Sequence, residues 1–258
     1  MPTQIQNAEI FQRLHIKGDP IVLFNVWDAG TARVVAAAGA KAIATGSWSV
    51  AAAHGYSDGQ ALPFGVALEN LARIVAAVSL PVTIDLEAGY GDAPEIVAES
   101  VARAIAHGAI GFNLEDQIIG GDGLYSIAAQ SRRIQAARHA ADHVSIRAFI
   151  NARTDIFLKA AAEQHDDRLV DEALQRALAY AEAGASGFFV PGLADERLMK
   201  RLCEACPLPV NIMVMASTPT AKRMAELGVA RISHGPGPYR QMMRMLEEAA
   251  RAVYTASP

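Results

Sequence analysis

The 258-residue sequence predicts an α/β fold of the (β/α)8-barrel (TIM-barrel) type, formed as a single domain over residues 1–258. Short apolar runs alternate with Ala-rich segments of helical period, and this strand-then-helix unit occurs eight times. Glycines end several helices just before the next strand, as in AAAGAKAI, IAHGAIGF, AEAGASGF and AELGVARI. No nucleotide-binding glycine fingerprint follows a strand, which disfavours an open doubly wound sheet.

Eight strands are expected, and their apolar character suits a parallel sheet buried on both faces. Their ranges are 21–26, 41–45, 80–86, 109–115, 144–152, 186–191, 208–214 and 229–233. The helices are expected to begin near Asp28, Phe64, Ala93, Ser126, Asp166, Ala194, Thr218 and Pro238. The longest irregular stretches, 46–63 and 116–125, both follow strands. We therefore place them at the C-terminal mouth of the barrel, where barrel active sites are found.

Charge and composition exclude several classes of function. Charged residues make up 19% of the chain, the formal net charge is −4, and no basic tract occurs, so we expect no binding to nucleic acid or to an anionic membrane. The N-terminal segment lacks the apolar core of a signal peptide, and no apolar run approaches the ~18 residues of a membrane span. Cys203 and Cys206 are too few for a disulfide scaffold. These features predict a cytoplasmic protein that acts on a small molecule.

Acidic residues gather where the third and fourth predicted strands end. Asp85 and Glu87 share one side of their strand because side chains alternate, and Glu115 ends the neighbouring strand. Three carboxylates at one point repel unless a cation lies between them, and oxygen ligands of this kind suit Mg2+, with Mn2+ as the alternative. The sequence therefore predicts a metal site at these three residues. The competing interpretation is that they form salt bridges or cap helices.

Other polar residues follow the fifth, seventh and eighth strands. Arg153 is suited to bind a carboxylate or phosphonate through two hydrogen bonds, unless an ion pair with Asp155 or Glu115 occupies it. Asn211 is a candidate substrate ligand. His234 is either a catalytic proton donor or a structural histidine bonded to backbone.

The loop after the second strand provides a further set of candidates. Thr45, Gly46, Ser47 and Trp48 follow that strand directly, and backbone N–H groups beside a glycine can approach an anionic substrate closely. Trp48 is expected either to form a wall of the substrate pocket or simply to pack against its neighbours. Asp58 is a second candidate acid, base or metal-shell residue, with a solvated loop acid as the alternative.

Several blocks in order, FNVWDAGTARVVAAAGAKAIATGS, DLEAGYGD, NLEDQ, FINARTD, PVNIMV and GVARISHGP, resemble the isocitrate lyase / phosphoenolpyruvate mutase superfamily over residues 10 to 245. The resemblance implies a (β/α)8 barrel, often with its last helix swapped between subunits, that forms a homodimer or homotetramer. It also implies Mg2+ and an α-oxycarboxylate substrate, which reacts through an enolate or by transfer of a phosphoryl group.

By this resemblance Asp85 binds the metal directly, while Glu87 and Glu115 act directly or through water. Gly46 and Ser47 would hold the substrate carboxylate. Arg153 would hold its distal anionic group, and Asp58 would lie in the metal shell or near the substrate.

This chain departs from the family pattern at two places. The family usually has Asp-x-Asp at the metal motif, whereas this chain has Asp85-Leu86-Glu87. Lyases of the family carry a Lys-Lys-Cys-Gly-His type loop whose Cys is the catalytic acid, but here the segment after Glu115 reads DQIIGGDGLY and contains no Cys, Lys or His. The Asn-bearing loop of a phosphoenolpyruvate mutase is missing as well.

We therefore expect a Mg2+-dependent lyase that cleaves a C–C bond of a small 2-oxo or 2-hydroxy acid through a metal-stabilised enolate. Arg153 would orient the distal carboxylate, and His234 or a water would reprotonate the enolate. Decarboxylation of an oxaloacetate-like acid demands least of the altered loop; cleavage of a methylisocitrate-like acid is the other form of this reading. One rival is P–C chemistry of the phosphoenolpyruvate mutase or phosphonopyruvate hydrolase type. Another is a barrel that binds 2-oxo acids without turnover.

Overall fold

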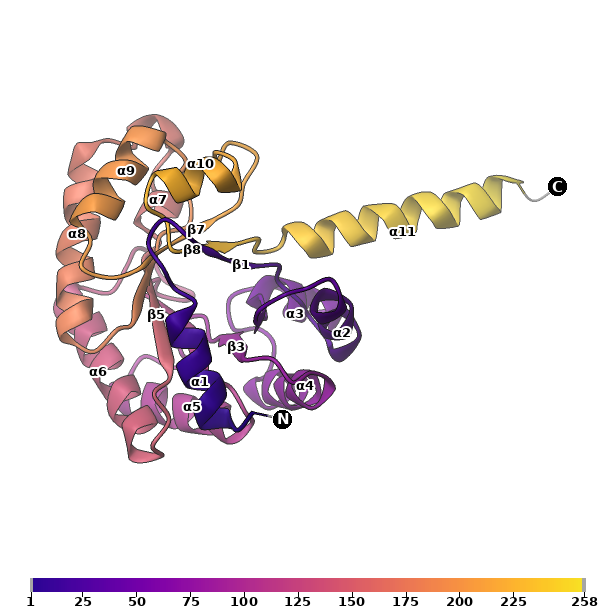
Figure 1. The fold of residues 1–258 in the computed structure, drawn as a ribbon, viewed down its shortest axis with the longest axis horizontal. Coiled ribbons are helices and arrows are strands. Elements are labelled where there is room, and N and C mark those ends of the chain that lie inside the picture. The colour runs from indigo at the N-terminus through magenta and orange to yellow at the C-terminus, as the bar shows by residue number, and fades with distance from the viewer. Residues whose placement is uncertain (1, 257–258) are drawn as a thin grey trace.

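The computed structural model describes residues 2–256 and confirms the predicted fold class. Eight parallel strands form one sheet in the order β1-β8-β7-β6-β5-β4-β3-β2. The two end strands meet at a bridge between Val26 and Thr45, which makes the sheet a nearly closed barrel (Figure 1). The strands are β1 (Ile21–Leu23), β2 (Ile43–Ala44), β3 (Val82–Asp85), β4 (Gly111–Glu115), β5 (Phe149–Arg153), β6 (Gly187–Phe189), β7 (Val210–Met213) and β8 (Arg231–Ser233).

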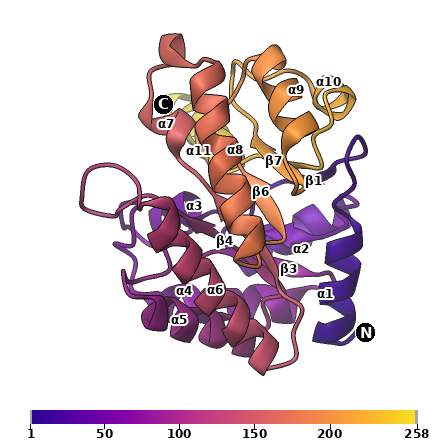
Figure 2. The ribbon, with the colours of Figure 1, turned by 90° about the vertical axis from the view of Figure 1, so that its left-hand side faces the viewer.

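Helices cover the outside of the barrel, and α5, α6, α8 and α9 pack side by side in that order (Figure 2). Short polar side chains accept hydrogen bonds from the first turns of several helices, for example Ser126 at α6 and Asp166 at α8. The helices are α1 (Gln4–Arg13), α2 (Ala29–Ala37), α3 (Ser47–Ala53), α4 (Phe64–Ala77), α5 (Pro94–Ala106), α6 (Ile127–His143), α7 (Ile156–Lys159), a 3-10 turn η1 (Ala162–Gln164), α8 (Asp167–Glu182), α9 (Glu196–Ala205), α10 (Ala221–Glu226) and α11 (Gly237–Ala256).

Several details differ from the prediction. The stretch 46–63, expected to be irregular, contains the short helix α3, and the N-terminal helix α1 was not predicted. The strand expected from residue 144 begins only at Phe149, because α6 continues to His143 and Ser145 then takes a left-handed φ of 58°. Pattern alone cannot separate the end of an amphipathic helix from the start of a buried strand.

Alternation along each strand divides the barrel into an apolar outside and a polar inside. On β4, Phe112 and Leu114 are fully buried in the main apolar core, whereas Asn113 and Glu115 face the other side of the strand. On β8, Ile232 belongs to the core, while Arg231 is hydrogen-bonded to Asn113 across the barrel. The interior therefore presents polar groups to the mouth, which is the arrangement that a binding site requires.

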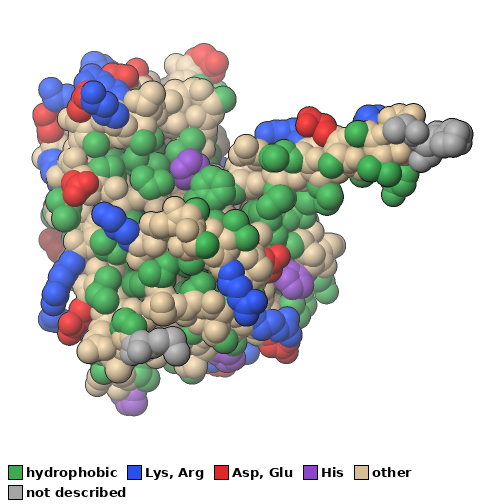
Figure 3. Space-filling view, turned by 45° about the vertical axis from the view of Figure 1, so that its right-hand side comes forward, with side chains coloured by type: hydrophobic (Ala, Val, Ile, Leu, Met, Phe, Trp, Pro, Cys, Tyr) green, Lys and Arg blue, Asp and Glu red, His purple; other side chains and the backbone are tan. Residues whose placement is uncertain are grey.

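The last helix, α11, projects away from the barrel (Figure 1). It carries exposed apolar side chains, among them Met243, Met245 and Leu246, and Figure 3 shows hydrophobic side chains along it. Within residues 2–256, no helix has both the length and the apolar character needed to cross a bilayer.

Candidate active site

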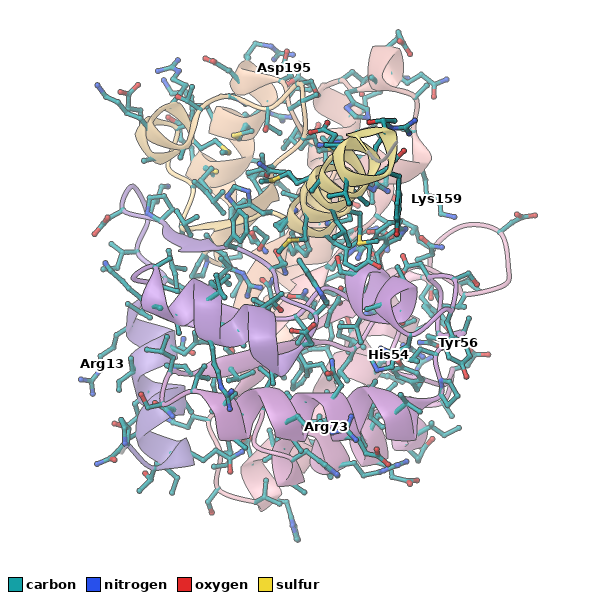
Figure 4. The ribbon with its side chains drawn as sticks, turned by 90° about the vertical axis from the view of Figure 1, so that its right-hand side faces the viewer. Arg13, His54, Tyr56, Arg73, Lys159 and Asp195 are labelled. Atoms are coloured by element: carbon teal, nitrogen blue, oxygen red, sulfur yellow. The ribbon has the colours of Figure 1, made fainter. Side chains whose placement is uncertain are left out.

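A cavity of about 180 Å3 lies among the carboxyl ends of the strands. In Figure 4, Tyr56, which follows α3, and Lys159, which ends α7, lie toward the right-hand edge of the view. The lining combines polar groups with apolar walls: Asn25, Gly46, Ser47, Trp48, Asp58, Asp85, Asn113, Arg153, Leu158, Phe189, Met213, Ser233, Gly235 and Pro236. The cavity is small, so it suits an acid of only a few carbon atoms.

Asp85 ends β3 and lies at the centre of this lining. The Ser47 hydroxyl donates to its Oδ2 at 3.0 Å, and the Ser47 backbone N–H donates to the same oxygen at 3.3 Å. The Thr45 hydroxyl accepts from the Asp85 backbone N–H at 3.1 Å. The loop after β2 is thus fixed to the end of β3, and predicted substrate and metal residues meet at one point.

Glu87 lies two residues further on, in a backbone turn with a φ of 50°. Its Oε2 accepts from the backbone N–H groups of Gly59 and Gln60, at 2.9 and 2.7 Å. Burial, together with the nearby carboxylates of Asp85 and Asp58, raises the pKa of Glu87 to about 7, although the two backbone N–H groups oppose this rise. Glu87 therefore holds the loop that carries Asp58 rather than pointing into the cavity.

Glu115 ends β4 and is tied to Arg153, its partner in the β4–β5 register. Nη1 of Arg153 contacts Oε2 of Glu115 at 2.8 Å, and the other edge of the guanidinium donates to Asp155 at 2.6 and 2.9 Å. Burial alone would lower the pKa of Arg153, but the two acids raise it well above its ordinary value. The ion pair considered as the alternative for Arg153 is therefore present, although Arg153 also lines the cavity.

The prediction that three carboxylates converge on one ion does not match this geometry. Within the described residues, no three His, Cys, Asp or Glu side chains form a ready-made metal cluster. Glu87 is engaged by backbone N–H groups and Glu115 by Arg153, because buried carboxylates take the nearest strong donors. Asp85 and Asp58 remain on the cavity. This donor set fits Mg2+ bound by one or two carboxylates with water completing its shell, which is how Mg2+ usually binds to proteins.

Asp58 reaches the cavity from the loop after α3. Burial raises its pKa, and the carboxylate of Asp85 raises it as well, while the positive charge of Arg153 lowers it. Two neighbouring acids that repel in this way would be relieved by a cation between them, directly or through water. Asp58 thus lines the same cavity as Asp85, and its place near a metal or substrate stays a prediction.

Besides Thr45, Glu87 and Glu115, two further predicted residues, His234 and Asn211, are absent from the lining of the cavity. The ring of His234 packs against Phe24, with centroids 5.1 Å apart, while its backbone N–H donates to Asn25. Strand alternation explains this, because Ser233 faces inward and its successor therefore faces away. Asn211 is 1% exposed, and its Oδ1 accepts from the Ser233 hydroxyl below the cavity lining.

The sequence analysis did not select several residues of the lining. Asn25 donates to the Thr45 carbonyl and accepts from the Gly235 N–H, so it links the segment after β1 to the ends of β2 and β8. Asn113 forms part of the floor. The strand alternation that placed Asp85 and Glu115 would have found Asn113 two positions before Glu115. The apolar wall residues carry no such signal.

Comparisons with known proteins agree with this architecture. A family model described as phosphoenolpyruvate phosphomutase matches residues 11–254. An uncharacterised protein of Mycobacterium tuberculosis is 35% identical over 243 residues, 94% of this chain and 88% of its own length. The 2-methylisocitrate lyase of Escherichia coli is 28% identical over 93% of this chain and 82% of the enzyme.

Two further similarities bear on the chemistry. The oxaloacetate decarboxylase of Pseudomonas fluorescens is 28% identical over 72% of this chain and 63% of the enzyme. A solved structure from Burkholderia cenocepacia J2315, provisionally named a phosphonomutase, is 54% identical with a TM-score of 0.95. That match covers 97% of this chain and 99% of the other.

Proposed function

This chain belongs to the phosphoenolpyruvate phosphomutase family, within a superfamily of Mg2+-dependent lyases and mutases, and from that premise we propose that it is a lyase. Its substrate would be a small 2-oxo or 2-hydroxy carboxylic acid, and the bond broken a C–C bond. The observation that carries the proposal is the group of Asp85, Ser47 and Arg153 around one cavity of about 180 Å3.

Asp85, with Asp58 beside it, would hold the Mg2+ ion. When bound, the ion supplies a Lewis acid that withdraws electrons from the carboxylate and the neighbouring oxygen of the substrate. The chain's own residues do the rest. Ser47 and the backbone beside Gly46 bind the carboxylate, and Arg153 attracts the far end of the substrate with the N–H groups that its acidic partners leave free. Trp48 and Phe189 exclude water from the cavity walls.

The engagement of Arg153 favours a carboxylate substrate over a phosphonate. Three of its donor contacts already go to Glu115 and Asp155, and these two carboxylates neutralise its charge locally. The apolar side chains of Leu158, Phe189 and Met213 also line the cavity. Arg153 is the one Lys or Arg among the described residues that line the cavity, so a doubly charged phosphonate would contact no second cationic side chain directly. The similarity to a lyase and a decarboxylase points the same way.

A substrate panel tests the proposal. Oxaloacetate, 2-methylisocitrate, 2,3-dimethylmalate and phosphonopyruvate are each incubated with the protein in Mg2+, and again after chelation with EDTA. We expect release of a 2-oxo acid from one of the three carbon acids, dependent on Mg2+. No turnover of any compound would refute the lyase and favour a barrel that binds without reacting.

The second candidate is P–C chemistry of the phosphonomutase or phosphonopyruvate hydrolase type, and the 54% identity to the Burkholderia protein favours it. Phosphorus NMR on phosphonopyruvate separates the two candidates. Loss of the phosphonate signal, with no carbon acid consumed, would replace the lyase by the phosphonate reaction.

The protein is also proposed to be a homo-oligomer in which α11 packs against a second copy. An isolated helix is marginally stable in water, and the exposed Met243, Met245 and Leu246 leave this helix with apolar surface to bury. The start of the helix is already part of the site, because Arg240 lies 4.5 Å over the ring of Trp48. Sedimentation analysis should show a dimer or tetramer, and a monomer at micromolar concentration would refute this arrangement.

A further inference from the structure

A layer of polar side chains inside the barrel forms the floor of the cavity. Asn113 on β4 is the register partner of Asp85 on β3, and both side chains line the cavity. Only 6% of Asn113 is exposed. Beneath it lies Arg231 of β8, which is 1% exposed and also contacts Ser233 in the lining, through Nε at 3.3 Å.

Two donors fix the direction of the Asn113 amide. Nη2 of Arg231 donates to Oδ1 of Asn113 at 3.3 Å, and Nδ2 of Asn151 donates to the same oxygen at 2.9 Å. A guanidinium has donors and no acceptor, so the Asn113 atom that faces Arg231 must be the oxygen. The amide nitrogen therefore turns away from Arg231.

The Nδ2 group of Asn113 has no acceptor within residues 2–256. The fully enclosed polar atoms that lack a partner include Oδ1 of Asn151, Nδ2 of Asn211 and Nη1 of Arg231, but they do not include Nδ2 of Asn113. Since Asn113 is in contact with the cavity, its two N–H groups open toward that space. Buried amides are normally paired, so a nearly buried donor that faces a cavity indicates a ligand.

Arg231 gives this floor a positive charge. Within the described chain, no carboxylate lies within ion-pair distance of its guanidinium, and Asp85 acts on it only through the longer-range Coulomb interaction. Burial lowers the pKa of Arg231 to about 9, and Asp85 opposes that change. Arg231 thus remains a cation at neutral pH and attracts anionic atoms toward the floor.

We propose that Asn113 is a substrate-binding residue whose amide N–H groups donate to an anionic oxygen of the bound acid, and that Arg231 is the positioning residue that holds the amide in this direction. This inference rests on the proposed function, because it adds a floor ligand to the same oxo-acid site. We expect the site to bind a small acid that places one charged oxygen at the barrel floor, between Asp85 and Arg231.

The test is the substitution Asn113→Asp. The carboxylate keeps an oxygen for Arg231 to donate to, so the fold should persist, but it replaces the cavity-facing N–H groups by an oxygen. Binding of oxalate, an unreactive two-carboxylate probe, is measured by calorimetry at saturating Mg2+, so that a change in metal affinity does not enter. Loss of a hydrogen bond to a charged group predicts about ten- to a hundred-fold weaker binding.

Asn113→Leu, with no added charge, separates loss of the donor from repulsion. We expect it to weaken oxalate binding as well, with thermal unfolding recorded for both variants to confirm that they are folded. Oxalate affinity within two-fold of the parent in either folded variant would overturn the role of Asn113. Failure of the parent protein itself to bind oxalate with Mg2+ would instead overturn the proposed function.

Discussion

Replacing Arg153 by Met measures how much the positive charge of Arg153 stabilises the two buried acids beside it. The substitution keeps much of the volume but leaves two carboxylates, Glu115 and Asp155, buried without their cation. Their side chains are 6% and 0% exposed, and the guanidinium contacts them at 2.8 and 2.6 Å. Breaking a buried ion pair by removal of one partner costs about 3–5 kcal/mol, mainly because the remaining charge stays desolvated.

The loss should depend on pH in a defined direction. Burial raises the pKa of Glu115, and Arg153 is the group that lowers it. Without Arg153 the folded-state pKa rises further above the unfolded value. An acid with a raised folded-state pKa is destabilising at high pH, where the unfolded chain is ionised, and this penalty disappears as the acid is protonated. The difference between parent and variant should therefore be large at pH 8 and smaller at pH 5.

Urea unfolding at both pH values measures this difference, with circular dichroism as the signal. The matched control is Arg73→Met, which removes an exposed pair with Glu69 at 3.1 Å. Surface pairs of this kind contribute about 0–1 kcal/mol, so the control should remain close to the parent at either pH. If Arg153→Met cost no more than the control, or lost the same stability at pH 8 and pH 5, the assignment of a buried, charge-compensating role would be wrong.

Two further variants test the packing of His15 against β5 and the glycine in the loop after β3. His15 stacks on Phe149 at 3.8 Å, and burial lowers its pKa to about 3. The unfolded chain then binds the extra proton as the pH falls below about 6.5, so stability present at pH 7.5 should decline by about 2 kcal/mol at pH 5. His15→Phe should remove that part of the decline in urea titrations, and equal slopes would argue against it. Gly89→Ala should destabilise by about 1–3 kcal/mol and reduce turnover, since φ is 86° and a Cβ would lie 3.0 Å from Val97 and 3.1 Å from Leu114. An unchanged Tm and unchanged rate in that variant would show that the loop does not depend on this glycine.

The sequence located the site through the ends of its strands. Asp85, Glu115 and Arg153 all follow buried β-rich runs, and parallel strands bring such positions to one edge. The sequence did not predict which hydrogen-bond donor each buried acid contacts. Glu87 accepts hydrogen bonds from the backbone N–H groups of Gly59 and Gln60. These two residues are distant from Glu87 in the sequence, and the type of a side chain does not reveal which backbone N–H group will act as a donor.

His234 was predicted to face the cavity, but side chains alternate along the strand, and His234 lies one residue away from the inward-facing position. Polar character made it a candidate, but Ser233 occupies the inward position and His234 packs on Phe24 outside the cavity. Asn113 shows the opposite case. It was overlooked beside the acids of NLEDQ, yet its distance of two residues from Glu115 placed it on the same face.

Calorimetric titration of Mg2+ into the parent protein and into Asp85→Asn tests the central claim most directly, with oxalate present in both samples. The account predicts that one ion binds to the parent and that the amide variant binds it at least about a hundred-fold more weakly, because a neutral oxygen replaces the charged ligand. Equal Mg2+ affinity in the two proteins would contradict the account, since the ion would then bind somewhere other than at the end of β3.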